Sequence, residues 1–222
     1  MTHFSFFVVT LLGKTEVPGD DIESSRLLLR LFTPVLKATV AKTAVAFLSE
    51  CMECLGGQGY VEEGGIAVLY RDTQVNAIWE GTTNVLANDL LRVLQGKSGK
   101  LTLEALDSYI ASAVRTGESC EKLKDLPQRF NEIYQSWRSH LTQTPADMVF
   151  AHARDLTLRL GQLIGAMELM IDAASDGNDI EIECCRRVFN LQYDWDEDET
   201  DRDRQIVFGR NGPAVPFMQA RL

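Results

Sequence analysis

The sequence predicts an all-α protein, a helical bundle with further helices toward its C-terminus. Apolar residues recur at three- and four-residue steps through most of the 222 residues, which is the period of one face of an α-helix. No stretch shows the strict alternation of apolar and polar residues that marks a half-buried strand. The N-terminal segment 1–19 is the exception. It is apolar from Phe4 to Leu12 but fits no periodic pattern, and we expect it to stand apart from the helices.

The first helical pattern follows Gly19 and stops at Gly56-Gly57. Its apolar positions are Leu27, Leu28, Leu31, Val35, Leu36, Val40, Ala44, Leu48 and Met52. Pro34 lies inside this pattern. Because proline lacks an N–H and crowds the preceding turn, we expect a kink or a new helix there.

A loop, a short helix and a turn follow the glycines. The segment 66–74 predicts a short helix whose Leu69 and Tyr70 face inward, and Arg71 is expected to pair with Asp72. After a turn, Thr82 or Thr83 can cap the next helix. That helix carries one apolar stripe, formed by Val85, Leu86, Leu90, Leu91 and Leu94.

Gly96-Lys97-Ser98-Gly99 is the best internal boundary. We therefore divide the chain into an unassigned segment 1–19, a helical domain 20–98 and a helical extension 99–222. Patterns in the extension predict helices over about 103–115, 120–141, 146–174 and 180–191, with Pro127 interrupting the first turns of the second.

The formal net charge of −10 argues against a nucleic-acid-binding surface and against anionic membranes as partners. Much of the excess lies in the acidic run 194–201, which is most simply a solvated loop. A divalent-cation site there is the lesser alternative, since its carboxylates do not follow a known loop spacing. No metal site is predicted, and the apolar N-terminal stretch is too short to insert into a bilayer.

Five cysteines form an odd count without framework spacing, which indicates free thiols in a reducing, intracellular compartment. The sequence does not decide between mitochondrion and cytoplasm. Cys51 and Cys54 have the spacing of a redox pair, but they lie late in a helical pattern rather than after a strand. A structural role is the simpler reading for both.

Glu80 is the carboxylate that stands out on physical grounds. It follows Ile78-Trp79, precedes Gly81, and lies in a turn that looks buried at the entrance of a helix. Exclusion of water would favour its protonated form, whereas the helix N-terminus would favour its charged form. Either a general base or an ordinary capping carboxylate fits. The three histidines, His3, His140 and His152, look isolated from any catalytic partner.

Three motifs resemble the C-terminal helical domain of acyl-CoA dehydrogenases. They are Gly56-Gly57-Gln58-Gly59-Tyr60, Tyr70-Arg71-Asp72 and Ile78-Trp79-Glu80-Gly81-Thr82-Thr83-Asn84, in the family's order and at its spacing. Val61-Glu62-Glu63-Gly64 and the long C-terminal extension resemble the AidB-like branch. The resemblance covers the chain from about Ser24 onward.

The resemblance implies a function and a set of site residues. It implies an FAD-dependent oxidoreductase that introduces an α,β double bond into acyl-CoA thioesters, with Glu80 as the catalytic base. Thr82 and Asn84 would contact the flavin. Gly56 and Gly57 would approach the adenosine end of an FAD that a neighbouring subunit holds. The family's usual assembly implies a homo-oligomer, a tetramer.

The family's N-terminal and middle domains have no counterpart in these 222 residues. We therefore expect an apparent fragment of such an enzyme, with poor flavin binding and little turnover on its own. The alternative, from a different class, is a non-catalytic helical module that binds acyl chains or a protein partner and retains the Glu80 turn as inheritance.

Overall fold

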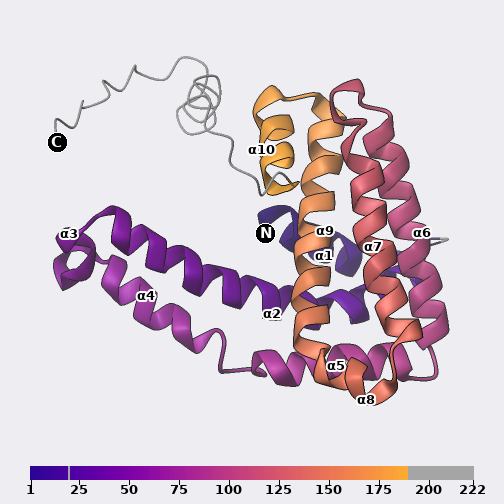
Figure 1. Ribbon diagram of the computed structural model, residues 1–222, viewed down its shortest axis with the longest axis horizontal. Helices are drawn as coiled ribbons and strands as arrows, with labels where there is room; N and C mark the ends of the chain where they lie inside the picture. Colours follow the sequence, from indigo (N-terminus) through magenta and orange to yellow (C-terminus); the bar gives the residue numbers. More distant parts are fainter. Residues whose placement is uncertain (20, 190–222) are drawn as a thin grey trace.

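The computed structural model describes residues 1–19 and 21–189, which form ten α-helices, two short 3-10 turns and no strand. The all-α prediction is therefore confirmed. The acidic run 194–201 lies outside the described residues. Figure 1 shows a bundle of long helices from which a thinner arm projects to one side.

Helix α1 (Thr2–Glu16) is the main departure from the expected fold. The segment predicted to stand apart is helical and packs against α2 and α9. Phe4, Val8 and Leu11 are buried at helical spacing. Their stripe was hidden in the sequence because Phe6, Val9 and Leu12 between them are apolar too, although they are exposed.

Helix α2 (Ile22–Cys54) runs through both parts of the molecule. It continues through Pro34, which is buried inside it, so the helix neither ends nor restarts there. Its most apolar 18 residues have a mean hydropathy of 1.4, enough by length and composition to cross a membrane. The core helix of a globular bundle passes the same test, and the first half of α2 packs in the core here, through Leu28, Leu31, Phe32 and Val35.

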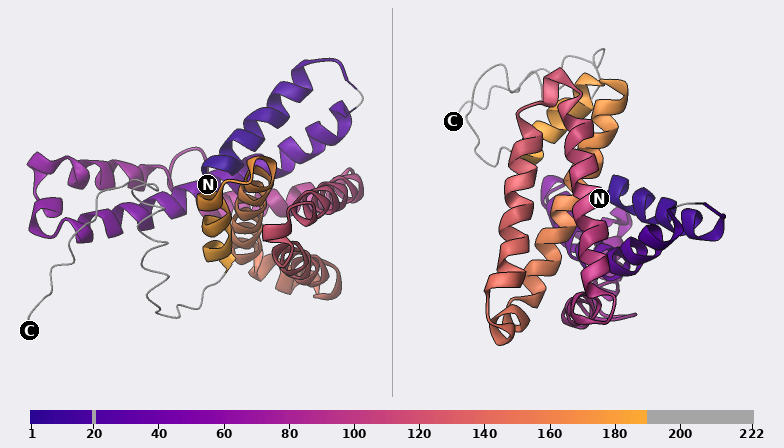
Figure 2. Two further views of the ribbon diagram at one scale, coloured as in Figure 1. Left: turned by 90° about the horizontal axis from the view of Figure 1, so that it is seen from above. Right: turned by 90° about the vertical axis from the view of Figure 1, so that its right-hand side faces the viewer.

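The arm, defined as residues 42–82, consists of the second half of α2, α3 (Gly57–Tyr60), the 3-10 turn η1 (Glu62–Gly64), α4 (Ile66–Val75) and the turn that leads to α5. In Figures 1 and 2 it extends as a pair of antiparallel helices, α2 and α4, closed at its tip by α3. Leu69 is 53% exposed on α4, so the prediction that it faces inward is wrong. Two helices cannot cover all of each other's apolar faces.

The remaining helices complete the bundle. They are α5 (Thr83–Gln95), α6 (Gly99–Glu118), α7 (Leu126–Gln143), α8 (Ala146–Ala151), α9 (Ala153–Asp176) and α10 (Asp179–Phe189), with the 3-10 turn η2 (Glu121–Leu123) before α7. Helix α9 is central, because it contacts α1, α2, α5, α6, α7 and α10. It crosses α2 closely at Gly161, where an added Cβ would lie 2.0 Å from Thr39 Oγ1.

One core joins both sides of the boundary expected near Gly96. An aromatic group at its centre brings together Phe4 and Phe7 of α1, Phe32 of α2 and Tyr109 of α6, with Phe7 stacked on Tyr109 at 4.9 Å between ring centroids. Leu90 of α5 and Leu160 of α9 are fully buried in the same cluster. The helices after Gly99 therefore share a core with those before it.

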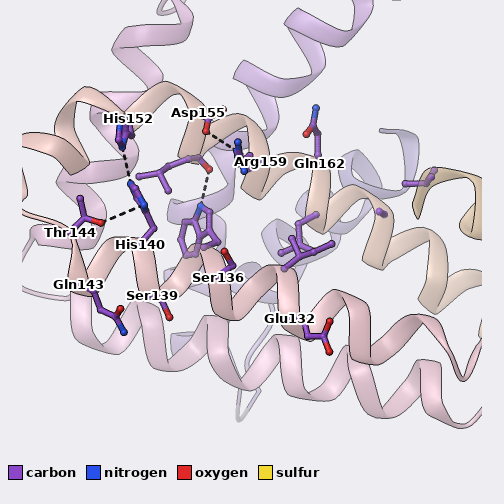
Figure 3. A pocket seen from close by; sticks show the side chains of 16 residues that line it. Glu132, Ser136, Ser139, His140, Gln143, Thr144, His152, Asp155, Arg159 and Gln162 are labelled. Carbon is purple, nitrogen blue, oxygen red and sulfur yellow. Dashed lines mark hydrogen bonds and ion pairs between the residues drawn. The ribbon is translucent and has the colours of Figure 1, made fainter. Parts of the chain in front are cut away.

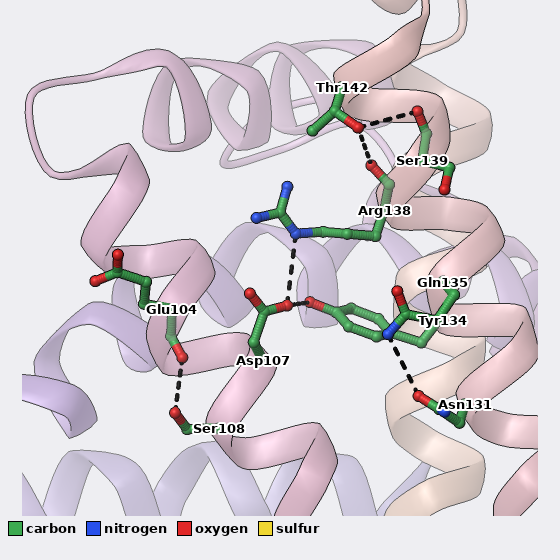
Figure 4. A network of polar contacts seen from close by, with 9 residues as sticks. All are labelled: Glu104, Asp107, Ser108, Asn131, Tyr134, Gln135, Arg138, Ser139 and Thr142. Carbon is green, nitrogen blue, oxygen red and sulfur yellow. Dashed lines mark hydrogen bonds and ion pairs between the residues drawn. The ribbon is translucent and has the colours of Figure 1, made fainter.

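Two polar clusters lie among these apolar contacts. The Tyr109 hydroxyl donates to Glu168 Oε1 of α9 at 2.5 Å, and burial raises the pKa of Glu168 to about 7. Between α6 and α7, the Tyr134 hydroxyl donates to Asp107, whose Oδ1 also lies 3.5 Å from Arg138 Nε (Figure 4). Each cluster joins two helices through a carboxylate.

Candidate active site

The predicted base, Glu80, lies in the turn between α4 and α5. After Val75 the chain makes one more helical turn, in which the N–H groups of Ile78 and Trp79 donate to the Val75 carbonyl at 2.9 and 3.0 Å. It then reverses through Glu80 at φ 52° and Gly81 at φ 103°. Glu80 is the one non-glycine residue with positive φ in the described chain. Such a conformation is uncommon outside glycine and asparagine and clusters at functional sites.

Lys37 of α2 holds this turn from both sides of Glu80. Its ammonium donates to the carbonyl oxygen of Trp79 at 2.7 Å and to that of Gly81 at 2.6 Å. Hydrogen bonds from a charged donor are stronger than those between neutral groups. This contact could not be inferred from the sequence, because the residues are more than forty positions apart.

The turn is not buried in this chain, so that part of the sequence interpretation is wrong. Trp79 is 57% exposed and Ile78 is 64% exposed, and Glu80 is exposed between them. Val85, at the start of α5, is 53% exposed. Glu80 therefore stands in an open apolar surface, and the described residues do not themselves exclude water from it.

Thr82 and Asn84 lie directly beyond Glu80, at the N-terminus of α5. Thr82 is the N-cap residue, but its side chain makes no capping hydrogen bond. The side-chain oxygen of Asn84 accepts a hydrogen bond from Arg154 Nη1 at 3.0 Å. Arg154 belongs to the first turn of α9, so the helical extension reaches the candidate site directly.

Gly56 and Gly57 lie at the other end of α4, at the tip of the arm, and the structure does not bring them together with Glu80 (Figure 1). Ten residues of helix, about 15 Å, separate the two ends of α4. Near the tip, Arg71 pairs with Glu62 rather than with Asp72, through two bonds of 2.7 and 2.8 Å. Neighbouring residues on a helix point in different directions, which explains why the predicted pair does not form.

Residues 20–95 match the family described as "Acyl-CoA dehydrogenase, C-terminal domain". This match includes the whole arm, the Glu80 turn and α5. Residues 20–95 are an acyl-CoA dehydrogenase C-terminal domain.

Similarity to members of this family extends beyond the matched domain. The chain is 36% identical over 221 residues, 91% of its length, to acyl-CoA dehydrogenase family member 11 of Caenorhabditis elegans. It is 43% identical over 94 residues, 39% of its length, to the putative acyl-CoA dehydrogenase AidB of Escherichia coli, of which these residues are 17%. The structure of C. elegans ACDH-11 in complex with C11-CoA superposes with a TM-score of 0.78 and 31% identity, over 96% of this chain.

The chain spans only about a third of these relatives: 35% of the C. elegans protein and 38% of the ACDH-11 chain.

Members of this family use FAD, and the residues present fit one wall of a flavin site. The backbone at Gly56 and Gly57 is open, because an added Cβ on either would meet nothing within 4 Å. The Thr82 hydroxyl makes no capping bond, and the α5 N-terminus behind it favours an anion or an electron-rich group. Within the described chain, no acceptor pairs with the backbone N–H of Glu80.

A second hollow lies away from the Glu80 turn, between α7 and α9 (Figure 3). It is a groove of about 900 Å³ whose lining includes Trp137, Leu156 and Leu163. At one end, His140 Nε2 lies 2.9 Å from His152 Nδ1. The expectation that these histidines are isolated is therefore wrong. The short α8 turns the chain back and brings them together, although they are twelve residues apart.

No group of three or more His, Cys, Asp or Glu side chains that could hold a metal ion occurs among the described residues.

Proposed function

We propose that this chain provides the catalytic base and one wall of the flavin and acyl-CoA sites of an FAD-dependent acyl-CoA dehydrogenase. The observation that carries the proposal is the Glu80 turn. It places an exposed carboxylate, in a left-handed backbone conformation, in an apolar surface inside the family match. The structure of the C. elegans relative was solved with an acyl-CoA, which supports this substrate class.

The residues of the turn have separate roles in this proposal. The Glu80 carboxylate accepts the α-proton of the thioester, and its backbone N–H donates to the thioester oxygen, which makes that proton more acidic. FAD, when bound, supplies the acceptor for the β-hydride. Thr82 and Asn84 would hold the flavin from the α5 N-terminus.

Gly56 and Gly57 would contact the adenosine end of a flavin held by a second subunit. This explains why the two motifs lie at opposite ends of α4. The active assembly is then a homo-oligomer, a tetramer in the family's usual form. The apolar arm supplies contact surface for it, since Phe47, Tyr60 and Leu69 are each more than half exposed.

The test compares this chain alone with the chain fused behind the N-terminal two thirds of the C. elegans relative. A panel of acyl-CoA thioesters and an artificial electron acceptor report turnover, and visible absorbance reports bound flavin. The chain alone should bind little flavin and turn over little, because one open wall cannot enclose the flavin ring. Tight, stoichiometric flavin in the chain alone would contradict this expectation.

In the fusion, Glu80→Gln should lower turnover by about 10²- to 10⁴-fold, the usual contribution of a positioned general base, while flavin remains bound. Glu118→Gln, at the exposed C-terminal end of α6 in the bundle, is the matched control and should leave turnover unchanged. If the Glu80 variant turns over at the rate of the unaltered fusion, Glu80 is not the base.

The groove between α7 and α9 supports a second candidate, a helical module that binds an acyl chain. Its apolar lining and volume suit a ligand of that kind. The fluorescence of Trp137, which lines the groove, can distinguish this module from the proposed dehydrogenase. Quenching of its fluorescence by a spin-labelled fatty acid, in a chain that neither holds flavin nor gains turnover in the fusion, would favour the module.

A further inference from the structure

The Glu80 turn has few anchors of its own. The Arg154 bond reaches Asn84 of α5, beyond the turn. Apart from the bonds from Lys37, the hydrogen bonds of residues 76–82 are local, with partners between Thr73 and Leu86. The Trp79 indole donates to Asn76 Oδ1 at 3.2 Å, which also stays within the turn. None of these bonds fixes the turn relative to α2 or to the bundle.

The backbone of the turn combines a strained residue, Glu80, with a conformationally free one, Gly81. A left-handed conformation is strained for a non-glycine residue, and Glu80 adopts it at φ 52°. Gly81 follows at φ 103°, with the wide conformational freedom of glycine. Without an external contact, the two peptide groups beside Glu80 could rotate, and its carboxylate would point in many directions.

Lys37 supplies that contact. Its ammonium bonds the carbonyl of Trp79, in the peptide group that precedes Glu80, and the carbonyl of Gly81, in the peptide group that follows Gly81. The Glu80–Gly81 peptide group lies between these two anchored groups, so its rotation is restricted, and with it the direction of the Glu80 Cα–Cβ bond. Lys37 itself is half-buried and emerges from the part of α2 that packs in the core, between the buried residues Val35 and Ala38. Lys37 therefore ties the turn to the part of α2 that is buried in the core.

We propose that Lys37 is a positioning residue for the dehydrogenation, which it serves by holding the Glu80 turn in the conformation that aims the carboxylate. This inference rests on the proposed role of Glu80 as base. A proton transfer depends steeply on the placement of the base, so a turn released by about 1 Å loses rate even when substrate still binds. A lysine suits the task because one ammonium can donate to two separate carbonyls.

The first test needs no activity and uses the 222-residue chain as it is. Amide hydrogen exchange is measured at Ile78, Trp79 and Leu86 in Lys37→Met, which keeps the length of the side chain but cannot donate. Exchange at these amides should become about 10-fold faster or more, which corresponds to the loss of a hydrogen bond from a charged group. Amides of α9 report whether the bundle remains folded.

Two further variants make this result specific. Lys42→Met, five residues along the same helix, should leave exchange in the turn unchanged. Lys37→Arg keeps a charged donor and should restore most of the protection, although its planar group cannot reproduce both bonds equally well. If Lys37→Met exchanges at the unaltered rate in the turn while α9 is unaffected, Lys37 does not hold the turn and the inference is overturned.

The second test uses the fusion protein described above. Lys37→Met should lower kcat at least 10-fold with KM within about twofold and with flavin bound, and Lys37→Arg should recover part of kcat. Faster exchange with unchanged kcat would overturn the positioning role. Faster exchange in a fusion where Glu80→Gln also has no effect would show that the proposed function fails, while Lys37 still holds the turn.

Discussion

The arm and the bundle are built from the same kind of helices but use their apolar residues in opposite ways. In the arm, residues 42–82, only Gly59 and Ala67 are buried, and large side chains such as Phe47, Tyr60 and Trp79 are more than half exposed. In the bundle, aromatic and aliphatic side chains close a continuous core. The family motifs lie in the arm, and the packing that stabilises the chain lies in the bundle.

In the proposed enzyme, the exposed apolar side chains of the arm contact parts of the assembly outside the described chain. Soluble proteins rarely leave large apolar side chains exposed side by side without a partner. In the proposed enzyme, apolar residues contribute to stability in the bundle and to assembly in the arm.

Removing an aromatic ring from the core should be the most damaging change. Phe32 is fully buried and contacts Phe4, Phe7 and Tyr109. Phe32→Ala should lower the free energy of unfolding by about 3–5 kcal/mol. Leu69→Ala, on the exposed face of α4, is the matched arm variant and should change it by no more than about 0.5 kcal/mol. Urea unfolding followed by circular dichroism measures both, and similar losses would remove the distinction between the two regions.

The half-buried carboxyl of Glu168 should make the bundle sensitive to pH. Its pKa is raised to about 7, chiefly by burial and also by the charge of Asp172, from 4.5 for an unperturbed glutamate. The folded state therefore binds the proton more tightly than the unfolded state does. The corresponding stability is present below about pH 4.5 and is lost as the pH rises toward and through about 7.

Glu168→Gln, which stays neutral, should remove this loss. At pH 8 it should raise the free energy of unfolding by at most about 3 kcal/mol relative to the unaltered chain, with a smaller difference at pH 5. Unfolding titrations of both proteins across this range provide the measurement. If the difference between the two proteins does not grow with pH, ionising Glu168 costs no more free energy in the folded state than in the unfolded state.

Two arginine–carboxylate ion pairs, one in the bundle and one in the arm, should show the smallest difference in their contribution to stability. Arg30 joins α2 to Asp89 of α5 through two bonds of 2.8 Å, and these bonds lower the pKa of Asp89. Arg71 makes the same double contact with Glu62 near the arm tip, where both side chains are 61% exposed. Arg30→Met should destabilise the chain by up to about 1 kcal/mol. Arg71→Met should have no measurable effect, and unfolding in low and high salt tests both. A larger effect at Arg71 would mean that the arm tip contributes to the stability of the fold.

The helices were predictable from the sequence wherever one apolar stripe stood out against polar neighbours. The stripe of α5, with Leu90 and Leu91 buried, is the clearest case. Helix α1 was missed because apolar residues occupy both its buried and its exposed faces. The path of α2 through Pro34 was missed because tertiary packing around a buried proline can outweigh the local cost of the lost hydrogen bond.

Local motifs identified Glu80, Thr82 and Asn84, but the contacts around them could not be inferred. Lys37 reaches the turn from 42 to 44 residues away, and Arg154 reaches Asn84 from 70 residues away. The exposure of Trp79 was also beyond reach. An apolar residue beside a catalytic motif predicts a water-excluding surface, but it does not reveal which chain provides the other half.

Helix α2 has a mechanical consequence. The first half of α2 packs in the core and its second half forms one side of the arm. A tilt of the helix near Lys37 would therefore move the arm relative to the bundle. The helix is about 25 Å long from Lys37 to Cys54, so a tilt of only about 5° would displace Gly56 and Gly57 by about 2 Å. Because Lys37 of the same helix bonds the carbonyls of Trp79 and Gly81, the tilt would also change the geometry of the Glu80 turn. Contact with the neighbouring subunit that is proposed at the arm tip would thus be coupled through α2 to the position of the Glu80 carboxylate.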